Sequence, residues 1–262
     1  MEFRFKQQLG AAWTASPQPS SASTATGGRA LPESTVENWD RLAAADAMWT
    51  VLSDPAKAGG KWQADEFFAT GASIVERIDA FEAMGIPIRR GVAVDFGCGL
   101  GRVSRWLATC FAHVVGVDIS PKMLELAEMH NAQRPPITFV HGNEANIPLA
   151  TSSADFIHSI IALQHIPQVL QRLYLREFTR LVRPGGCLYF QIPSHPIYVK
   201  ETSFRMMFDT PSGPSAIDIH TFPRADVEAL LMAGGCELLQ AFDDESCGPG
   251  IKSYFYLARK TG

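Results

Sequence analysis

The sequence predicts an α/β protein built on a doubly wound, mostly parallel sheet. From Val92 onwards, short apolar segments alternate with longer segments of helical periodicity, which is typical of parallel strands whose connecting helices cover both faces of a sheet. Such crossover connections are right-handed almost without exception. The two apolar segments at the end of the chain have no helix between them, so we expect these last strands to pair antiparallel at one edge.

The N-terminal part predicts a flexible leader, residues 1–33, followed by helices. The leader is rich in Ser, Thr and Ala and has little apolar surface to bury, so a disordered tail is favoured over a transit peptide. Ser34 and Glu37 have the spacing of a capping box, which predicts a helix that runs to about Leu52. A second helical region is expected over 64–84, where apolar residues keep one face.

The elements that follow are indicated by local signals. Ser120 and Pro121 have the positions of an N-cap and a first-turn proline, and they predict the start of a helix. The run from Pro193 to Phe222 is rich in Pro, Ser and aromatic residues, and we expect it to be irregular. The expected strands are 92–96, 113–118, 137–142, 154–162, 187–192, 236–242 and 253–260, and the expected helices are 103–111, 120–130, 167–182 and 223–235.

The composition argues against several classes of protein. The 262 residues carry a formal net charge of −4 and no block of Lys or Arg, so neither nucleic acid nor an anionic membrane is an expected partner. No apolar run approaches the roughly 18 residues that a membrane span needs. The cysteines are odd in number and form no C-x-x-C pair, which favours a reduced, cytoplasmic location over a disulfide framework. We expect no metal site.

The glycine-rich segment Val92–Arg102 predicts a ligand-binding turn. Gly97, Gly99 and Gly101 lie between a strand and a helix, where a doubly wound sheet binds nucleotide-like ligands. Glycine lets backbone amides approach a ligand closely, and the N-terminus of the helix supplies partial positive charge. The loop therefore suits a carboxylate or a phosphate.

Two acids decide between these ligands. The spacing is G-x-G-x-G, unlike the G-x-G-x-x-G of dinucleotide-binding loops, and Asp95 before it would repel a pyrophosphate but bind an ammonium group. Asp118 ends the next strand, 21 residues after Gly97 (118 − 97), where an acid is expected to accept hydrogen bonds from both hydroxyls of a ribose. An amino-acid end and a ribose on one ligand indicate S-adenosylmethionine as the cofactor.

The chain resembles the class I S-adenosylmethionine-dependent methyltransferases. The matching segments occur in family order between Gly91 and the C-terminus, and they are VDFGCGLGR, GVDIS, HGNEANIPL, ADFIHSI and LVRPGGCLYF. The resemblance implies a Rossmann-like methyltransferase fold with a seven-stranded sheet whose last strand is inserted antiparallel. With it we interpret 91–262 as the catalytic domain, 34–90 as a helical lid and about 193–222 as a substrate-cap insertion.

The resemblance also implies cofactor contacts around the carboxyl ends of the strands. Asp118 should hold the ribose, and Ile119 should pack on the adenine ring. Further contacts are expected at the methionine end from Asp95, Gly97, Cys98 and Gly99, at the adenine edge from Asn143 and Glu144, and at the floor from Ile160 and Ile161. Asn143 departs from the aspartate that family members often have there, but an amide oxygen can accept the same hydrogen bond.

The acceptor side of the site has fewer candidates. A general base matters only when the acceptor holds its proton near neutral pH, and His165 is the candidate for that role. A histidine that packs against or caps the following helix remains the alternative. Trp62, Phe67 and Phe68 are candidates for a lid over the cofactor or acceptor, although the two phenylalanines fit a helix packed on the sheet equally well.

The expected acceptor is a small molecule that is methylated on O, N or C. Tyr198 and Phe204 of the insertion are candidates to line its pocket. Residues 159–162 lack the Asn or Asp, the prolines and the aromatic residue usual in enzymes that methylate exocyclic base amines, so nucleic acid is not an expected acceptor. We expect a monomer or a homodimer. An NAD-dependent oxidoreductase and a non-catalytic protein that keeps the cofactor fold remain as alternatives.

Overall fold

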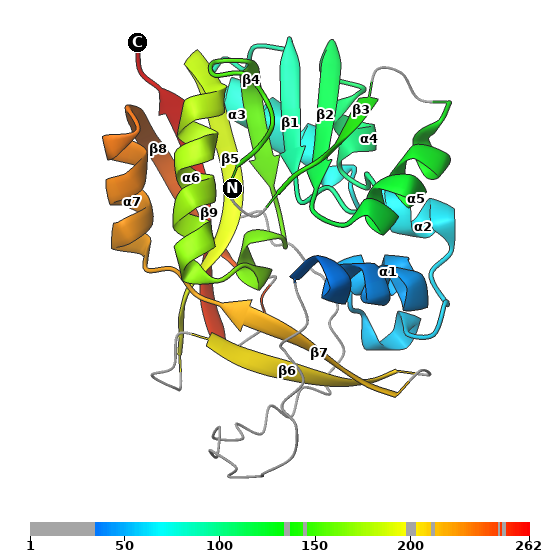
Figure 1. Cartoon of the computed structure of the whole chain (residues 1–262). Coiled ribbons are helices and arrows are strands. Elements are labelled where there is room, and N and C mark those ends of the chain that lie inside the picture. The colour runs from blue at the N-terminus through cyan, green and yellow to red at the C-terminus, as the bar shows by residue number, and fades with distance from the viewer. Residues whose placement is uncertain are drawn as a thin grey trace.

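A seven-stranded mixed sheet forms the centre of the molecule (Figure 1). The computed structural model describes residues 35–133, 137–143, 146–197, 203–210, 213–245, 247 and 250–262, so the expected leader and Ser34 lie outside the described residues. The strands are β1 (Val92–Phe96), β2 (His113–Asp118), β3 (Ile137–His141), β4 (Ala154–Ser159), β5 (Val182–Pro196), β8 (Cys236–Asp244) and β9 (Ile251–Lys260).

The strand order confirms the predicted fold class. The strands lie in the order β3-β2-β1-β4-β5-β9-β8, with β1 to β5 parallel to one another. The last strand, β9, is inserted between β5 and β8 and pairs antiparallel with both. The carboxyl ends of β1 to β5 therefore meet at one edge of the sheet, which is where a ligand is expected.

Helices cover both faces of this sheet. They are α1 (Thr35–Val51), α2 (Ala64–Ala69), α3 (Ser73–Ala83), α4 (Ser104–Leu107), α5 (Pro121–Asn131), α6 (Gln168–Leu181) and α7 (Arg224–Ala233), with short 3₁₀ helices η1 (Pro55–Lys57) and η2 (Leu163–His165). Neighbouring residues of a strand point to opposite faces, so Val94 enters a hydrophobic core with α6 and α7 while Ala93 enters another with α3 and α4.

The expected start of α5 is confirmed. The Ser120 hydroxyl accepts a hydrogen bond from the Met123 N–H at 3.0 Å, and Pro121 occupies the first turn. This cap fixes the segment that follows β2, and it therefore fixes the position of the acid at the end of that strand.

Two helical expectations are only partly correct. The region 64–84 divides into α2 and α3, because a side chain at Gly71 would lie 2.3 Å from the carbonyl oxygen of Arg102 and the chain has to pass closely there. The helix expected over 103–111 is the single turn α4, followed by turns.

The expectation that 193–222 is irregular is wrong. Strands β6 (Ser203–Thr210) and β7 (Gly213–His220) form an antiparallel hairpin below the main sheet (Figure 1). Ile217 and Ile219 are buried and alternate with the half-buried Asp218 and His220, which is a strand pattern that the surrounding Pro and Ser residues obscure.

Candidate active site

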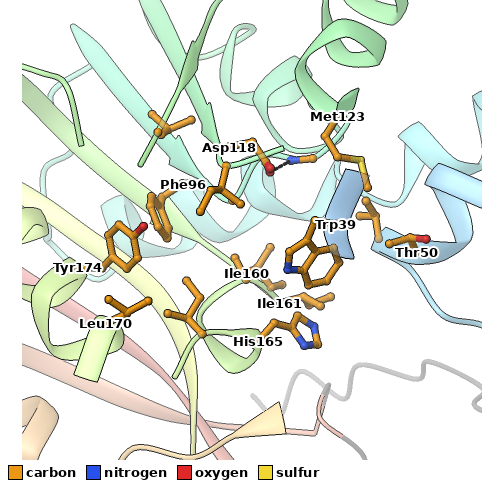
Figure 2. A pocket seen from close by; sticks show the side chains of 18 of the residues that line it. Trp39, Thr50, Phe96, Asp118, Met123, Ile160, Ile161, His165, Leu170 and Tyr174 are labelled. Carbon is orange, nitrogen blue, oxygen red and sulfur yellow. Dashed lines mark hydrogen bonds between the residues drawn. The ribbon is translucent and has the colours of Figure 1, made fainter. Parts of the chain in front are cut away.

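A cavity opens at the carboxyl ends of β1, β2 and β4, and α1 covers part of it (Figure 2). Its volume is about 900 Å³, including the solvent in its mouth. The lining is mostly apolar and consists of Trp39, Thr50, Val51, Phe96, Gly97, Gly99, Val117, Asp118, Ile119, Met123, Gly142, Ile160, Ile161, Ala162, His165, Ile166, Pro167, Leu170 and Tyr174. An edge of this kind is the usual ligand site of an open α/β sheet.

The glycine loop forms one wall of the cavity. The N–H groups of Gly97 and Cys98 donate to the carbonyl oxygen of Val117 at 2.8 and 3.1 Å, so the loop is tied to the end of β2. Gly97 has a φ of 69°, and a Cβ there would lie only 2.1 Å from the Cβ of Ala162. Only glycine fits this close approach.

Cys98 and Gly101 do not line the cavity. The Cys98 side chain is buried, and burial raises the pKa of its thiol well above the ordinary value, as expected for an unreactive cysteine. A Cβ at Gly101 would meet Asn131 Nδ2 at 2.8 Å and Phe139 Cζ at 2.9 Å. Gly101 therefore allows close packing behind the loop.

Asp118 is the acid of the cavity wall. Its Oδ2 accepts from the Gly99 N–H at 2.8 Å, and its Oδ1 accepts from the Ser120 N–H at 2.9 Å. Burial raises the pKa of this carboxyl, and the backbone hydrogen bonds oppose that rise. A carboxylate has about four acceptor positions, so the N–H groups of Gly99, Ser120 and Ile119 still leave room for a ligand to donate to Asp118.

Asp95 is enclosed beneath the loop and does not line the cavity. Its Oδ2 accepts from the Ser104 hydroxyl at 2.6 Å, and its Oδ1 lies 2.9 Å from Nδ1 of His158. Asp95 is only 2% exposed. The expected direct contact between this carboxylate and an ammonium group therefore has no support in the geometry.

The three isoleucines of the expected site all line the cavity. Ile119 follows Asp118, and Ile160 and Ile161 follow β4 (Figure 2). Ile161 has a φ of 60°, which is rare for a β-branched residue, and its N–H donates to Gln191 Oε1 at 3.1 Å. Backbone strain of this kind is tolerated mainly where the surroundings hold it, often at ligand sites.

Asn143 is exposed and folds onto its own loop. Its Oδ1 accepts from the Asn146 N–H at 2.8 Å, and its carbonyl oxygen accepts from the Tyr174 hydroxyl at 2.6 Å. Gly142 is the residue of this segment that lines the cavity. Glu144 lies outside the described residues.

His165 lines the cavity with both ring nitrogens engaged. Its Nδ1 lies 3.0 Å from the carbonyl oxygen of Asp218, which can only accept, and its Nε2 lies 3.1 Å from the amide nitrogen of Gln164, which can only donate. The ring is therefore neutral and carries its proton on Nδ1. Burial lowers the pKa of His165 to about 4, which agrees with this state.

The aromatic lid residues expected from α2 do not reach the cavity, which corrects that expectation. Phe67 and Phe68 are 0% and 2% exposed and pack with Leu100 in a separate core, while the Trp62 indole donates to a backbone carbonyl. Tyr198 lies outside the described residues, and Phe204 is described only as a backbone position in β6.

Helix α1 contributes the lining residues that sequence reasoning missed. Trp39, Thr50 and Val51 come from this helix, which has a kink at Asp46. Periodicity shows that a helix has an apolar face but not which surface covers that face. Leu170 and Tyr174 of α6 were missed too, although their spacing of four residues places them on one helix face.

Two kinds of feature are absent from the part of the chain that the structure describes. No cluster of three or more His, Cys, Asp or Glu residues there could hold a metal ion. Among the same residues, no helix is both long and apolar enough to cross a membrane.

The strand order, the glycine loop and the acid on the cavity wall define an α/β protein whose last strand is antiparallel and whose cavity lies where open α/β sheets usually bind ligands. A family model described as "Methyltransferase domain" matches residues 94–190. The solved structure of an S-adenosylmethionine-dependent methyltransferase from Clostridium acetobutylicum superposes with a TM-score of 0.58 at 16% identity, covering 73% of this chain and 92% of that one.

Two curated relatives are similar over part of the chain. Malonyl-[acyl-carrier protein] O-methyltransferase of Pectobacterium atrosepticum is 33% identical over 159 residues, 59% of this chain and 54% of the relative. Demethylmenaquinone methyltransferase of Staphylococcus aureus is 28% identical over 131 residues, 47% of this chain and 54% of the relative. The matches thus span about half the length of these relatives. Residues 94–190 therefore resemble a methyltransferase domain, and the fold is like that of the Clostridium acetobutylicum enzyme.

Proposed function

We propose that this protein is an S-adenosylmethionine-dependent methyltransferase that transfers a methyl group to an O, N or C atom of a small-molecule acceptor. Asp118 carries the proposal, because its half-buried carboxylate is held by two backbone N–H groups and retains acceptor positions beside the glycine loop. The mostly apolar lining supports the same conclusion, since the ligand joins a ribose to an apolar ring.

The chemistry of the lining fits S-adenosylmethionine. Asp118 would accept hydrogen bonds from the two ribose hydroxyls, and Ile119 would pack against the adenine ring. Because the N–H groups of Gly97 and Gly99 are engaged by Val117 and Asp118, these glycines would offer their carbonyl oxygens to the ammonium group of the methionine end. Because Ser104 and His158 enclose Asp95, we assign that end to backbone groups and not to a direct ionic contact.

In this reaction the protein would position the acceptor and exclude water. When bound, S-adenosylmethionine supplies a methyl group on a positively charged sulfur, and the electron pair of the broken S–C bond stays on sulfur as the lone pair of the acceptor bonds to carbon. Where the acceptor carries a proton, His165 Nε2 would receive it once the Gln164 amide releases that nitrogen. The pKa of His165, lowered to about 4, makes its ring a weak base near neutral pH, so this role suits only an acceptor whose proton becomes strongly acidic as the methyl group bonds.

The names of the relatives leave the accepting atom open. One is named as an O-methyltransferase of a malonyl group on acyl-carrier protein, and the other for demethylmenaquinone. Because acceptors as different as these occur among similar chains, we propose the class of reaction for this protein without choosing among O, N and C.

We propose that α1, at the start of the 34–90 segment, acts as the lid over the cavity. Near its start, Asp40 accepts from the Ser120 hydroxyl and, at 3.1 Å, from the Lys122 N–H. At its end, Val51 lies over Gly99, where a Cβ would meet its Cγ2 at 2.9 Å. Ligand binding under this helix should slow amide hydrogen exchange in α1.

Calorimetry tests the proposed function directly. We expect S-adenosylhomocysteine to bind and NADH, the ligand of the alternative oxidoreductase class, not to bind. Incubation of the protein with S-adenosylmethionine and cell extract, followed by mass spectrometry for products that gain one methyl group, would then identify the acceptor. Tight binding of NADH without binding of S-adenosylhomocysteine would overturn the proposal.

A further inference from the structure

The indole N–H groups of the described tryptophans differ in one respect. Three of them donate to backbone carbonyl oxygens at 2.7 to 3.1 Å, and these are Trp49, Trp62 and Trp106. The indole N–H of Trp39 has no hydrogen-bond partner among the described residues, although the side chain is half-buried. Because Trp39 lines the cavity, this N–H is available to donate to a ligand bound there.

Trp39 is placed to meet such a ligand. It lines the cavity, and its ring meets the His165 ring edge-on with centroids 5.2 Å apart. Figure 2 shows the indole nitrogen turned toward Ile160 and so toward the interior of the cavity.

The other side-chain donors of the lining are already engaged. The Thr50 hydroxyl donates to the carbonyl oxygen of Leu42 at 3.1 Å, the Tyr174 hydroxyl donates to a carbonyl at 2.6 Å, and His165 Nδ1 donates to a carbonyl at 3.0 Å. Within the described part of the chain, Trp39 therefore provides the one side-chain donor of the lining that is free for a ligand.

The position of Trp39 along α1 separates it from the glycine loop. Val51, at the other end of the helix, is the residue that lies over Gly99. Trp39 instead faces the segment after β4, and Figure 2 places His165 on the opposite side of the cavity from Asp118. The ribose and methionine ends of the cofactor are assigned to the Asp118 and glycine-loop side, so the side of Trp39 and His165 is left for the acceptor.

We propose that Trp39 binds the methyl acceptor, with its indole N–H donating to an oxygen atom of the acceptor and its ring packing on a flat, largely apolar body. This inference rests on the proposed function, which supplies the reaction. It narrows the acceptor class to molecules such as phenols, enols or aromatic acids, whose oxygen lies on an otherwise apolar frame. The apolar neighbours Ile166, Pro167 and Leu170 match that frame.

The test follows the Trp39 indole proton by NMR on protein labelled with ¹⁵N-tryptophan. The Trp39→Phe variant assigns the resonance, because it removes one indole signal and keeps an aromatic ring. The probes are 1-naphthol, which has a flat apolar body with one oxygen, and naphthalene, which lacks the oxygen. Both are added with and without S-adenosylhomocysteine, whose own binding is first measured by calorimetry.

We expect 1-naphthol to move the Trp39 indole proton downfield and naphthalene to leave it close to its original position. Calorimetry should show about tenfold weaker binding of 1-naphthol to Trp39→Phe, the scale of one neutral hydrogen bond, and equal binding of naphthalene. Trp62→Phe is the matched control, since its indole N–H already has a carbonyl partner outside the cavity, and it should bind 1-naphthol like the wild type.

Two results would overturn the inference. One is a Trp39 resonance that does not respond to 1-naphthol in either state, or equal affinity of Trp39→Phe and wild type for it. The other is a resonance that moves with S-adenosylhomocysteine alone and moves no further with 1-naphthol, which would assign the donor to the cofactor. If S-adenosylhomocysteine does not bind, the proposed function is refuted instead. Its binding is therefore measured before any probe is added.

Discussion

Replacing Asp118 by asparagine is the sharpest perturbation of the proposed site, because it removes the charge and keeps the shape of the side chain. Both carboxylate oxygens already accept a backbone N–H, from Gly99 and from Ser120, at 2.8 and 2.9 Å. An amide has one oxygen acceptor and one NH₂ donor, so the variant cannot keep both of these bonds and also accept from a ribose.

The magnitude follows from the bonds that are lost. A hydrogen bond to a charged group contributes about 1.5–3 kcal/mol, so we expect S-adenosylhomocysteine to bind Asp118→Asn about 10- to 150-fold more weakly. The fold itself should change little in stability. Burial raises the pKa of Asp118, so the folded protein binds the carboxyl proton more tightly than the unfolded chain does. The stability that this group contributes is therefore lost as the pH rises from its unfolded pKa through its folded pKa. At neutral pH the variant removes this cost and thereby offsets its lost hydrogen bond.

Calorimetry gives the dissociation constant, and urea unfolding gives the stability. Asp155→Asn is the matched control, because Asp155 is a buried carboxyl at the start of β4 that accepts from the Val92 N–H at 2.8 Å and pairs with Arg183, away from the cavity. We expect the control to lose stability and keep its affinity. Equal affinity of Asp118→Asn and wild type for S-adenosylhomocysteine would refute the ribose assignment.

Three further predictions concern the surroundings of the cavity. The pKa of His165 is lowered from 6.5 to about 4, so between these pH values the unfolded chain binds a proton that the folded protein does not. At about 1.4 kcal/mol per pKa unit, the free energy of unfolding of the wild type should fall by about 2 kcal/mol more than that of His165→Gln between about pH 7 and about pH 4.5. Equal losses in urea titrations would contradict the buried neutral ring. Gly97→Ala should lower the free energy of unfolding more than Gly60→Ala in the same assay. Both glycines have a positive φ, which costs an alanine about 1–2 kcal/mol, but only at Gly97 would the new Cβ lie 2.1 Å from a neighbouring side chain. Equal effects would mean that the glycine loop relaxes freely. Ser104→Ala removes the hydroxyl that donates to Asp95 at 2.6 Å, so it should lower the free energy of unfolding by about 1–3 kcal/mol and leave the affinity for S-adenosylhomocysteine unchanged. A weaker affinity would indicate that Asp95 does contact the methionine end of the cofactor.

The elements of the main sheet could be predicted because their signals are local. The strands β1 to β4 and the central part of β5, residues 187–192, are compact apolar segments between turn or helix signals, and Ser120 marks the start of α5 by its own side chain. The observed β5 is longer, because it also includes the segment around Pro184. Patterning does not determine strand order, so the inserted β9 was predicted only through the family resemblance. The β6–β7 hairpin was missed, because the alternation that includes Ile217 and Ile219 is short and lies beside Pro- and Ser-rich turns.

The cavity lining was less predictable, because it depends on tertiary packing. Phe67 and Phe68 are more apolar than anything in the first turns of α1, and that is why they are enclosed in a core while the amphipathic Trp39 lies at the cavity.

Asp95 and Asp118 show why sheet register decides which acid meets a ligand. Both stand at or near the end of an apolar strand, and the sequence predicted that both would contact the cofactor directly. The register pairs Asp95 directly with His158 of β4, and alternation turns both side chains to the α3 and α4 face, where Ser104 completes the enclosure. β1 ends at Phe96, opposite Val117, so Asp118 has no partner residue in β1, although it still pairs with His141 of β3. On the β1 side the chain continues into the glycine loop, and the Gly99 N–H holds the Asp118 carboxylate at the cavity wall.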